Sequence, residues 1–228
     1  MKILLLGGTG LIGKQVLLSL VFYPQVKKTI LWARVEKTDS NPNVPIELVH
    51  VSFESFKAGK VQVPDGLDAV ICCLGTTIKV AGSEEKFREI DYEYPLLVAK
   101  QAKAKKVKTF LIVTAMGSDP NSSLFYNRVK GEIERDLSSL EFPYLGIFRP
   151  SLLLGDRKEI RVGEKIGEII SAIIPFGLLG LNRFKPILAE FVARSMVKTL
   201  LGEASEMHKI SVVKIFENDE LWELGKNH

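Results

Sequence analysis

A glycine-rich turn directly after the first apolar run constrains the fold of this chain more than any other feature. Residues 2–6 are followed by the string Gly7-Gly8-Thr9-Gly10-Leu11-Ile12-Gly13 and then by an amphipathic stretch. These glycines satisfy both G-x-G-x-x-G and G-x-x-G-x-x-G, patterns that let backbone N–H groups approach a pyrophosphate at a helix N-terminus. The string therefore predicts a strand, a phosphate-binding turn and a helix. The turn residues that we expect to contact the cofactor are Gly7, Thr9, Gly10, Leu11 and Ile12.

Short apolar runs alternate with longer amphipathic ones up to residue 148. We expect strands at 2–6, 28–32, 46–51, 69–73, 109–114 and 144–148, and helices at 11–21, 84–105 and 124–138. The run 69–73 is apolar throughout, which is typical of a parallel strand buried on both faces. The alternation predicts a doubly wound α/β fold with a mainly parallel sheet. Ligands of such folds bind outside the carboxyl ends of the strands.

The alternation stops after Pro150. We expect residues 151–186 to form a small cap on the substrate side, followed by a helix at 187–201 and a strand at 210–215. Because no Ser/Pro/Gly-rich linker divides the 228 residues, the sequence predicts a single domain over 1–228. The most apolar stretch, 169–181, contains Pro175 and is shorter than the ~20 residues of a transmembrane helix. It is expected to pack in the cap, with a membrane-surface role and an apolar ligand as open alternatives.

The charge of the chain argues against a nucleic-acid-binding protein. The net charge is only +4, from 31 basic and 27 acidic residues, which does not favour a nucleic-acid-binding protein. The lysine-rich stretch 103–108 falls at the end of a predicted helix, where the negative end of the helix dipole accounts for it.

The cysteines indicate a reducing compartment. Cys72 and Cys73 are adjacent in a predicted strand and point to opposite faces, so they are poorly placed for a disulfide. With no apolar signal-peptide region at the start, this predicts a cytoplasmic protein. Cys73 is expected to be a small buried residue rather than a nucleophile, and three histidines and two cysteines supply no ligand set for a catalytic metal.

Residues 8–14 also match G-x-x-x-x-G-K, the start of a nucleoside-triphosphate-binding loop. That loop continues with Ser or Thr, whose hydroxyl binds magnesium, whereas this chain has Gln15. We therefore interpret the glycines as a dinucleotide-binding turn.

The residues about 20 positions after the last glycine predict which dinucleotide binds. NAD-binding proteins place Asp or Glu there to bind the ribose hydroxyls, but this chain has Trp32, Ala33 and Arg34. An arginine can pair with a 2′-phosphate, so the sequence favours NADP(H), with Lys37 as a second cation. The alternative is that Arg34 is an ordinary surface residue.

A second pattern points to proton transfer. Tyr126 and Lys130 lie four residues apart on a predicted helix, hence on one face, and Thr114 ends the strand before it. A tyrosine assisted by an ammonium group is a suitable acid/base, and Thr114 can donate a hydrogen bond to a substrate carbonyl. Tyr23 and Lys27 have the same spacing, but they follow the first helix and are not expected to face the crevice.

Taken together, these strings resemble the atypical short-chain dehydrogenases/reductases, most closely the Tat-interacting oxidoreductase-like group. The strings that carry the resemblance are Gly7 to Gly13, Cys72-Cys73-Leu74-Gly75-Thr76-Thr77, Tyr126-x-x-x-Lys130-Gly131-Glu132 and Phe148-Arg149-Pro150. The resemblance implies an NADP-binding Rossmann fold in which Cys73, Leu74, Gly75 and Thr76 lie along the cofactor, with Pro150 and Leu152 or Leu153 near the nicotinamide and Lys130 on its ribose.

Two positions depart from the family pattern. Threonine stands at Thr114, where serine is common. Ser52 replaces an aspartate that usually contacts adenine, which leaves the backbone near Phe53 for that contact.

We therefore expect an NADP(H)-dependent oxidoreductase that transfers hydride between the nicotinamide and a small carbonyl or alcohol substrate, which the apolar cap suggests is itself apolar. The expected catalytic residues are Thr114, Tyr126 and Lys130. The alternative is a regulatory protein that senses NADPH and binds a protein partner without turnover. Sugar-nucleotide epimerisation is a third option, for which the C-terminal part is short.

Overall fold

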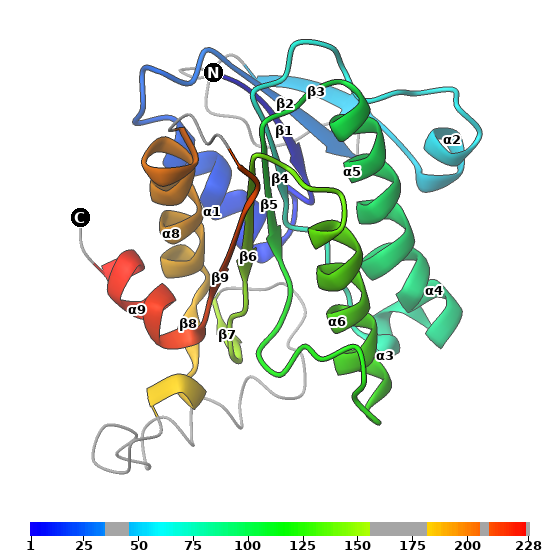
Figure 1. The fold of residues 1–228 in the computed structure, drawn as a ribbon, viewed down its shortest axis with the longest axis vertical. Coiled ribbons are helices and arrows are strands. Elements are labelled where there is room, and N and C mark those ends of the chain that lie inside the picture. Colours follow the sequence, from blue (N-terminus) through cyan, green and yellow to red (C-terminus); the bar gives the residue numbers. More distant parts are fainter. Residues whose placement is uncertain (35–45, 156–181, 206–209, 227–228) are drawn as a thin grey trace.

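The main sheet of the described chain is parallel, and β7 and β8 form a separate two-stranded pair. The structure, a computed structural model, describes residues 1–34, 46–155, 182–205 and 210–226. Within these ranges seven strands are hydrogen-bonded in the order β3-β2-β1-β4-β5-β6-β9, all parallel (Figure 1). The predicted doubly wound α/β fold is confirmed. The strands are β1 (Lys2–Leu6), β2 (Lys28–Ala33), β3 (Ile46–His50), β4 (Ala69–Cys72), β5 (Thr109–Val113), β6 (Tyr144–Phe148) and β9 (Val212–Phe216).

Helices cover both faces of this sheet (Figure 1). One face carries α1 (Leu11–Leu20), α8 (Ala189–Leu201) and α9 (Asn218–Lys226). The other carries α2 (Phe53–Lys57), α3 (Ile78–Ala81), α4 (Glu84–Arg88), α5 (Tyr94–Ala104) and α6 (Phe125–Ser138). This arrangement leaves the carboxyl ends of the central strands open between the two layers of helices.

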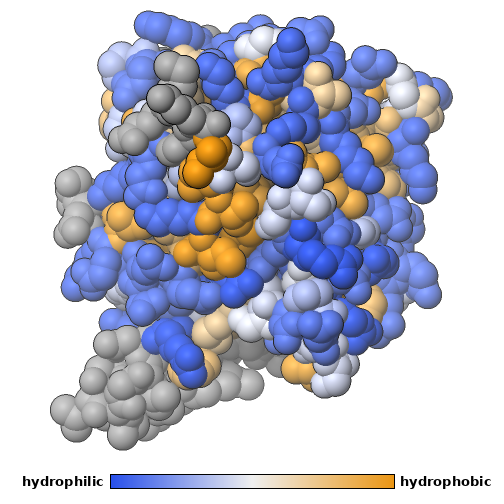
Figure 2. Space-filling view, viewed as in Figure 1, coloured by the Kyte–Doolittle hydropathy of each residue, from blue (hydrophilic) through white to orange (hydrophobic). Residues whose placement is uncertain are grey.

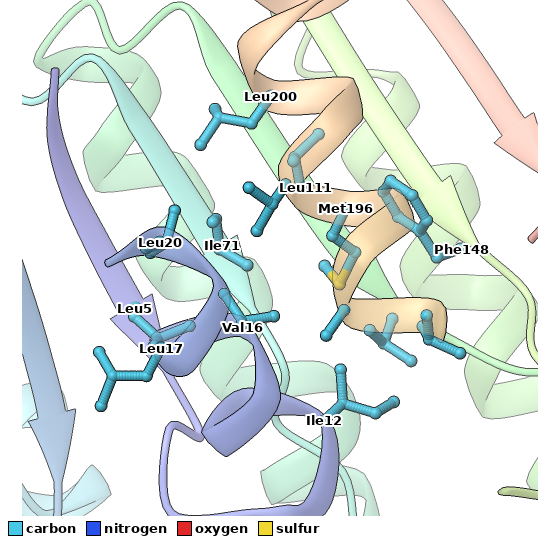
Figure 3. Packing of buried hydrophobic residues seen from close by; sticks show 14 of the residues in the cluster. Leu5, Ile12, Val16, Leu17, Leu20, Ile71, Leu111, Phe148, Met196 and Leu200 are labelled. Carbon is cyan, nitrogen blue, oxygen red and sulfur yellow. The ribbon is translucent and has the colours of Figure 1, made fainter. Parts of the chain in front are cut away.

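Each face of the sheet has its own hydrophobic core because strand side chains alternate in direction. Leu5, Ile71 and Leu111 pack against α1 and α8, as Figure 3 shows. Their neighbours in sequence belong to the second core, under α5 and α6. Strands buried on both faces are typical of parallel sheets, and they hold the turns at their carboxyl ends in fixed positions.

The helix predicted over 84–105 is not continuous. It consists of α4, a π-helical turn at Glu89–Glu93, and α5. In an uninterrupted α-helix the N–H of residue 95 would donate to the carbonyl of Asp91, but Pro95 has no N–H. The hydrogen-bond register shifts instead, and the Tyr94 N–H donates to the carbonyl of Glu89, five residues back. Such turns are frequent at functional sites.

The C-terminal part differs from the prediction in two ways. The helix expected from 187 begins at Ala189, because β8 (Ile187–Leu188) pairs in parallel with β7 (Leu153–Leu154). The predicted strand at 210–215 lies at Val212–Phe216, and α9 follows it unpredicted. Most of the expected cap, residues 156–181 with the apolar stretch 169–181, lies outside the described residues.

The outer strand β9 exposes apolar side chains at one edge of the sheet. Val213 and Ile215 are 43% and 40% exposed. Figure 2 shows the molecule in the view of Figure 1. An apolar area lies near the middle of the visible surface, among mostly hydrophilic side chains. Among the helices in the described ranges, none combines the length and apolarity that crossing a membrane requires.

Candidate active site

A crevice of about 570 Å³ opens where the central strands end. Its walls come from the turn after β1, the loop after β4, the end of β5, the start of α6 and the β7–β8 pair. This is the position that the strand order predicts for a ligand. The predicted residues that line it are Thr9, Gly10, Leu11, Ile12, Cys73, Leu74, Gly75, Thr76, Thr114, Tyr126, Lys130 and Leu153.

The glycine turn forms the phosphate-binding end of the crevice. Gly7 has a φ of 73°, and its carbonyl accepts a hydrogen bond from the Gly10 N–H at 2.9 Å. A Cβ at Gly13 would lie 2.2 Å from the Gly7 carbonyl oxygen, so only glycine fits there. No side chain caps α1, and the positive end of its dipole therefore faces the crevice. These features fit the pyrophosphate of a dinucleotide.

A buried ion pair occupies the floor of the crevice. Lys130 Nζ lies 2.7 Å from Asp91 Oδ1, and their side chains are 5% and 0% exposed. The second oxygen of Asp91 accepts the Thr76 N–H at 3.0 Å. Burial opposes the charge on Lys130, but the Asp91 carboxylate and then Tyr126 outweigh it and raise the pKa of Lys130 to about 12. Asp91 thus connects α6 to the loop after β4 and keeps Lys130 charged.

Asp91 is a site residue that sequence reasoning missed. It lies in the π-helical turn, and it shares a helical face with Phe87, Tyr94 and Val98, which are buried. The spacing 87, 91, 94, 98 is that of a buried helix stripe. A carboxylate within such a stripe needs a buried partner, and this signal could have identified it.

Tyr126 stands in the first turn of α6, one turn before Lys130. Its ring packs against Phe87 with the ring centroids 5.4 Å apart, and the residue is partly exposed along the crevice. Tyr23, the tyrosine with the same spacing to a lysine, follows α1 and packs against the core under α8. The structure thus separates the two pairs as the sequence predicts.

Thr114 lines the crevice, but its hydroxyl is engaged elsewhere. Thr114 Oγ1 donates to Glu134 Oε1 at 2.5 Å. The Glu134 carboxylate also lies 2.5 Å from Arg149 Nη2, and Arg149 Nη1 lies 2.9 Å from Glu217. Because a carboxylate only accepts hydrogen bonds, the Thr114 proton points toward α6. Sequence reasoning missed Glu134, although it lies four residues after Lys130 on the same helix face.

Four predicted cofactor residues lie outside the crevice lining. Gly7 contributes the backbone of the turn, and the Pro150 carbonyl accepts the Met116 N–H after β6. Phe53 begins α2 and packs on Tyr94, with ring centroids 5.1 Å apart. Arg34 is exposed at the end of β2. Lys37 lies outside the described residues.

Arg34 lies within electrostatic reach of a carboxylate on α2. Hydrogen bonds from its own backbone and from Ser52 lower the pKa of Glu54, and Lys86 and Arg34 add smaller attractive contributions.

Cys72 is buried, whereas Cys73, expected to be buried, is half-buried where it lines the crevice. Burial raises the pKa of Cys72 to about 12 and also raises that of Cys73, which opposes formation of a nucleophilic thiolate. The described residues also contain no cluster of three or more His, Cys, Asp or Glu side chains that could hold a metal ion.

Comparison with known proteins decides the family. Residues 42–173 match the model of the HIM1 family. The chain belongs to the HIM1 family. It is 32% identical to the rat protein HTATIP2, over 99% of this chain and 90% of the relative. It is 33% identical to FMP52-1, mitochondrial, of Scheffersomyces stipitis, over 99% of both chains. These relatives confirm the predicted resemblance to atypical short-chain dehydrogenases/reductases and its Tat-interacting group.

Solved structures agree on the fold. MoeE5 in complex with UDP-glucuronic acid and NAD superposes with a TM-score of 0.67 at 12% identity, covering 95% of this chain and 76% of MoeE5. A UDP-glucose 4-epimerase from Thermotoga maritima gives 0.65 at 14% identity, covering 99% and 82%. At such identities the likeness establishes the Rossmann-like fold of the HIM1 chain and not its substrate.

The predicted cytoplasmic location is wrong. The fungal FMP52 relatives are named as mitochondrial proteins. The prediction rested on two unpaired cysteines and on the lack of a signal-peptide-like apolar region, and neither feature distinguishes one reducing compartment from another.

Proposed function

We propose that this HIM1-family protein is an NADP(H)-dependent oxidoreductase acting on a small carbonyl or alcohol substrate. The observation that carries the proposal is that the glycine turn of α1 and the pair Tyr126 and Lys130 line one crevice. Solved structures of the same fold contain NAD, which supports a nicotinamide dinucleotide as the cofactor. When bound, the dinucleotide supplies or accepts a hydride at C4 of its nicotinamide.

Tyr126 transfers the proton in this mechanism. It gives its phenolic proton to the substrate oxygen during reduction and takes a proton from the alcohol during oxidation. Lys130 stabilises negative charge on the phenolic oxygen and binds the nicotinamide ribose. Its ammonium has three donors, of which one faces Asp91, so two remain for these contacts.

Thr114 contacts the substrate oxygen from the end of β5. Its hydroxyl offers lone pairs to the crevice while its proton is held by Glu134. Donation to a carbonyl, as the sequence predicts, requires the hydroxyl to turn away from Glu134. In the orientation described, the Thr114 oxygen presents only lone pairs to the crevice, so the hydrogen bond to a carbonyl oxygen comes from Tyr126.

The remaining predicted residues bind the cofactor along its length. Arg34 pairs with the 2′-phosphate, and Phe53 supplies backbone to the adenine. Leu74, Gly75 and Thr76 line the middle of the crevice and Leu153 its nicotinamide end, while Pro150, outside the lining, contributes through the backbone after β6.

A cofactor-sensing protein without turnover is the second candidate, and one observation favours it. The Thr114 proton is committed to Glu134, so the described site holds one hydroxyl donor fewer than the sequence predicts. Such a protein binds NADPH through the same residues but does not require Tyr126.

The first experiment is calorimetric titration of the purified apoprotein with NADPH and, separately, with NADH. Tight NADPH binding with weak NADH binding supports the proposal. If neither NADPH nor NADH binds, the proposal is overturned. If NADPH binds, consumption of NADPH on a panel of aldehydes and ketones separates the oxidoreductase from the sensor.

A further inference from the structure

We propose that the substrate of this crevice carries no anionic group, and that Asp91 is the residue that excludes carboxylate- and phosphate-bearing carbonyl compounds. The inference rests on the proposed function and adds the substrate class to it. It follows from how the charges on the crevice floor are paired.

The positive charge on the crevice floor is already neutralised. Lys130 Nζ lies 2.7 Å from Asp91 and both side chains are almost fully buried, so the pair presents a dipole to the crevice rather than a free cation. Gly75 lies directly over the pair: a Cβ there would be 3.7 Å from Asp91 Oδ1 and 3.9 Å from Lys130 Nζ. The absence of a side chain at Gly75 lets the pair act on a ligand in the crevice.

The other charged side chains of the crevice lie on its opposite wall. They are Lys14 of α1, which is exposed to solvent, and Glu190 of α8, which is paired with Arg194. Among the described lining residues, two are therefore acidic and two basic. Much of the remaining wall of the crevice is apolar and consists of Val80, Val113, Leu153, Leu154 and Leu188.

An anionic substrate is disfavoured by this arrangement. A carboxylate entering the crevice loses its hydration, and its attraction to Lys130 is offset by repulsion from Asp91. A neutral carbonyl compound has no charge to desolvate and is not repelled by Asp91. Its carbonyl oxygen can still accept a hydrogen bond from Tyr126. By contrast, an unpaired Lys130 would attract an anion strongly in this buried position.

The first test uses two aldehydes of the same shape. The purified protein with NADPH is given 4-isopropylbenzaldehyde or 4-formylbenzoate, which differ in a neutral isopropyl group and a carboxylate of similar shape, neither of which activates the aldehyde. We expect kcat/KM to be at least about tenfold higher for the neutral aldehyde, since juxtaposed like charges cost several kcal/mol. An equal or higher value for 4-formylbenzoate overturns the inference, and this comparison needs no variant.

The second test changes the charge at Asp91. In Asp91→Asn the amide oxygen can still accept the Thr76 N–H, but the negative charge is gone. We expect the preference for the neutral aldehyde to narrow by about tenfold. Asp136→Asn is the matched control, because Asp136 lies further along α6, bonded to Tyr92 and Arg135 outside the crevice. A preference unchanged in Asp91→Asn, or narrowed equally in the control, overturns the role of Asp91.

Failure of the proposed function is distinguished by measuring binding without turnover. Titrations followed by saturation-transfer NMR give the Kd of each aldehyde with and without NADPH. If neither aldehyde is reduced, the oxidoreductase proposal fails. Weaker binding of 4-formylbenzoate then still supports the charge inference, and equal or tighter binding overturns it.

Discussion

The hydroxyl of Thr114 and the carboxylate of Glu134 are joined by a hydrogen bond of 2.5 Å between β5 and α6. Arg149, which follows β6, holds the same carboxylate, and it also reaches Glu217 at the end of β9. A residue at the crevice is thereby tied to α6 and to the ends of β6 and β9. The bond indicates that Thr114 has a structural role in addition to the proposed contact with substrate.

Replacing Thr114 tests the structural role. Thr114→Val keeps the shape but leaves a buried carboxylate with one partner fewer, so we expect a loss of about 1.5–3 kcal/mol in the free energy of unfolding. Thr114→Ser keeps the hydroxyl and should lose less than about 1 kcal/mol. Urea unfolding measures both. Equal losses in the two variants would show that the methyl group, not the hydrogen bond, matters.

Removing the phenolic hydroxyl of Tyr126 tests the proposed chemistry. Tyr126→Phe should lower kcat by about 10²-fold or more, because general acid–base catalysis contributes about 10²–10⁴. NADPH affinity should change little. Tyr23→Phe is the matched control, since Tyr23 has the same spacing to Lys27 outside the crevice. Wild-type turnover in Tyr126→Phe excludes this tyrosine as the proton donor.

Charge changes at Arg34 and Glu54 test the choice of dinucleotide. Arg34→Ala should weaken NADPH binding by about tenfold or more and leave NADH binding nearly unchanged, because only NADPH carries the 2′-phosphate. Glu54→Gln removes a nearby negative charge and should strengthen NADPH binding. Calorimetry measures the Kd of NADPH and of NADH for the wild type and both variants. If Arg34→Ala weakens both equally, Arg34 does not read the 2′-phosphate.

Two alanine substitutions in the glycine turn should differ sharply. In Gly13→Ala the new Cβ would lie 2.2 Å from the Gly7 carbonyl oxygen, whereas in Gly10→Ala it would lie 3.2 Å away. We expect Gly13→Ala to destabilise the apoprotein by about 3 kcal/mol and Gly10→Ala by about 1 kcal/mol or less. Thermal unfolding without cofactor gives the comparison. Similar losses would contradict the packing of the turn.

The ion pair on the crevice floor makes stability depend on pH. Because the folded state raises the pKa of Lys130 from 10.5 to about 12, its charge stabilises the fold fully below 10.5, and this contribution is lost as pH rises toward 12. The difference in unfolding free energy between wild type and Lys130→Met should therefore shrink over this range. A constant difference for Lys130→Met would contradict the pair.

Much of the fold could be predicted because the parallel strands are short, apolar and followed by clear turn signals. The glycine turn and the pair Tyr126 and Lys130 were predictable for the same reason: their spacing is local. Asp91 and Glu134 were not found, because a carboxylate on a buried helix face is stabilised by partners far away in sequence. Thr114 was predicted at the crevice, but the direction of its proton depends on Glu134.

The break in the predicted helix at 84–105 shows a second limit. Its cause, Pro95, is visible in the sequence, but a proline near a helix start is equally compatible with an ordinary first turn. The register shift to a π-helical turn depends on packing both Asp91 against Lys130 and Val98 into the core.

This π-helical turn makes chain length itself a constraint on the protein. Successive residues of an α-helix are rotated by about 100° around the helix axis. Deleting one residue within Glu89–Glu93 would either close the wide turn to an ordinary α-helical turn or, if the wide turn persisted, rotate α5 relative to α4 by that angle. Either Asp91 would leave the crevice floor or the apolar face of α5 would leave the sheet. We therefore expect related chains to vary the side chains here more freely than the number of residues.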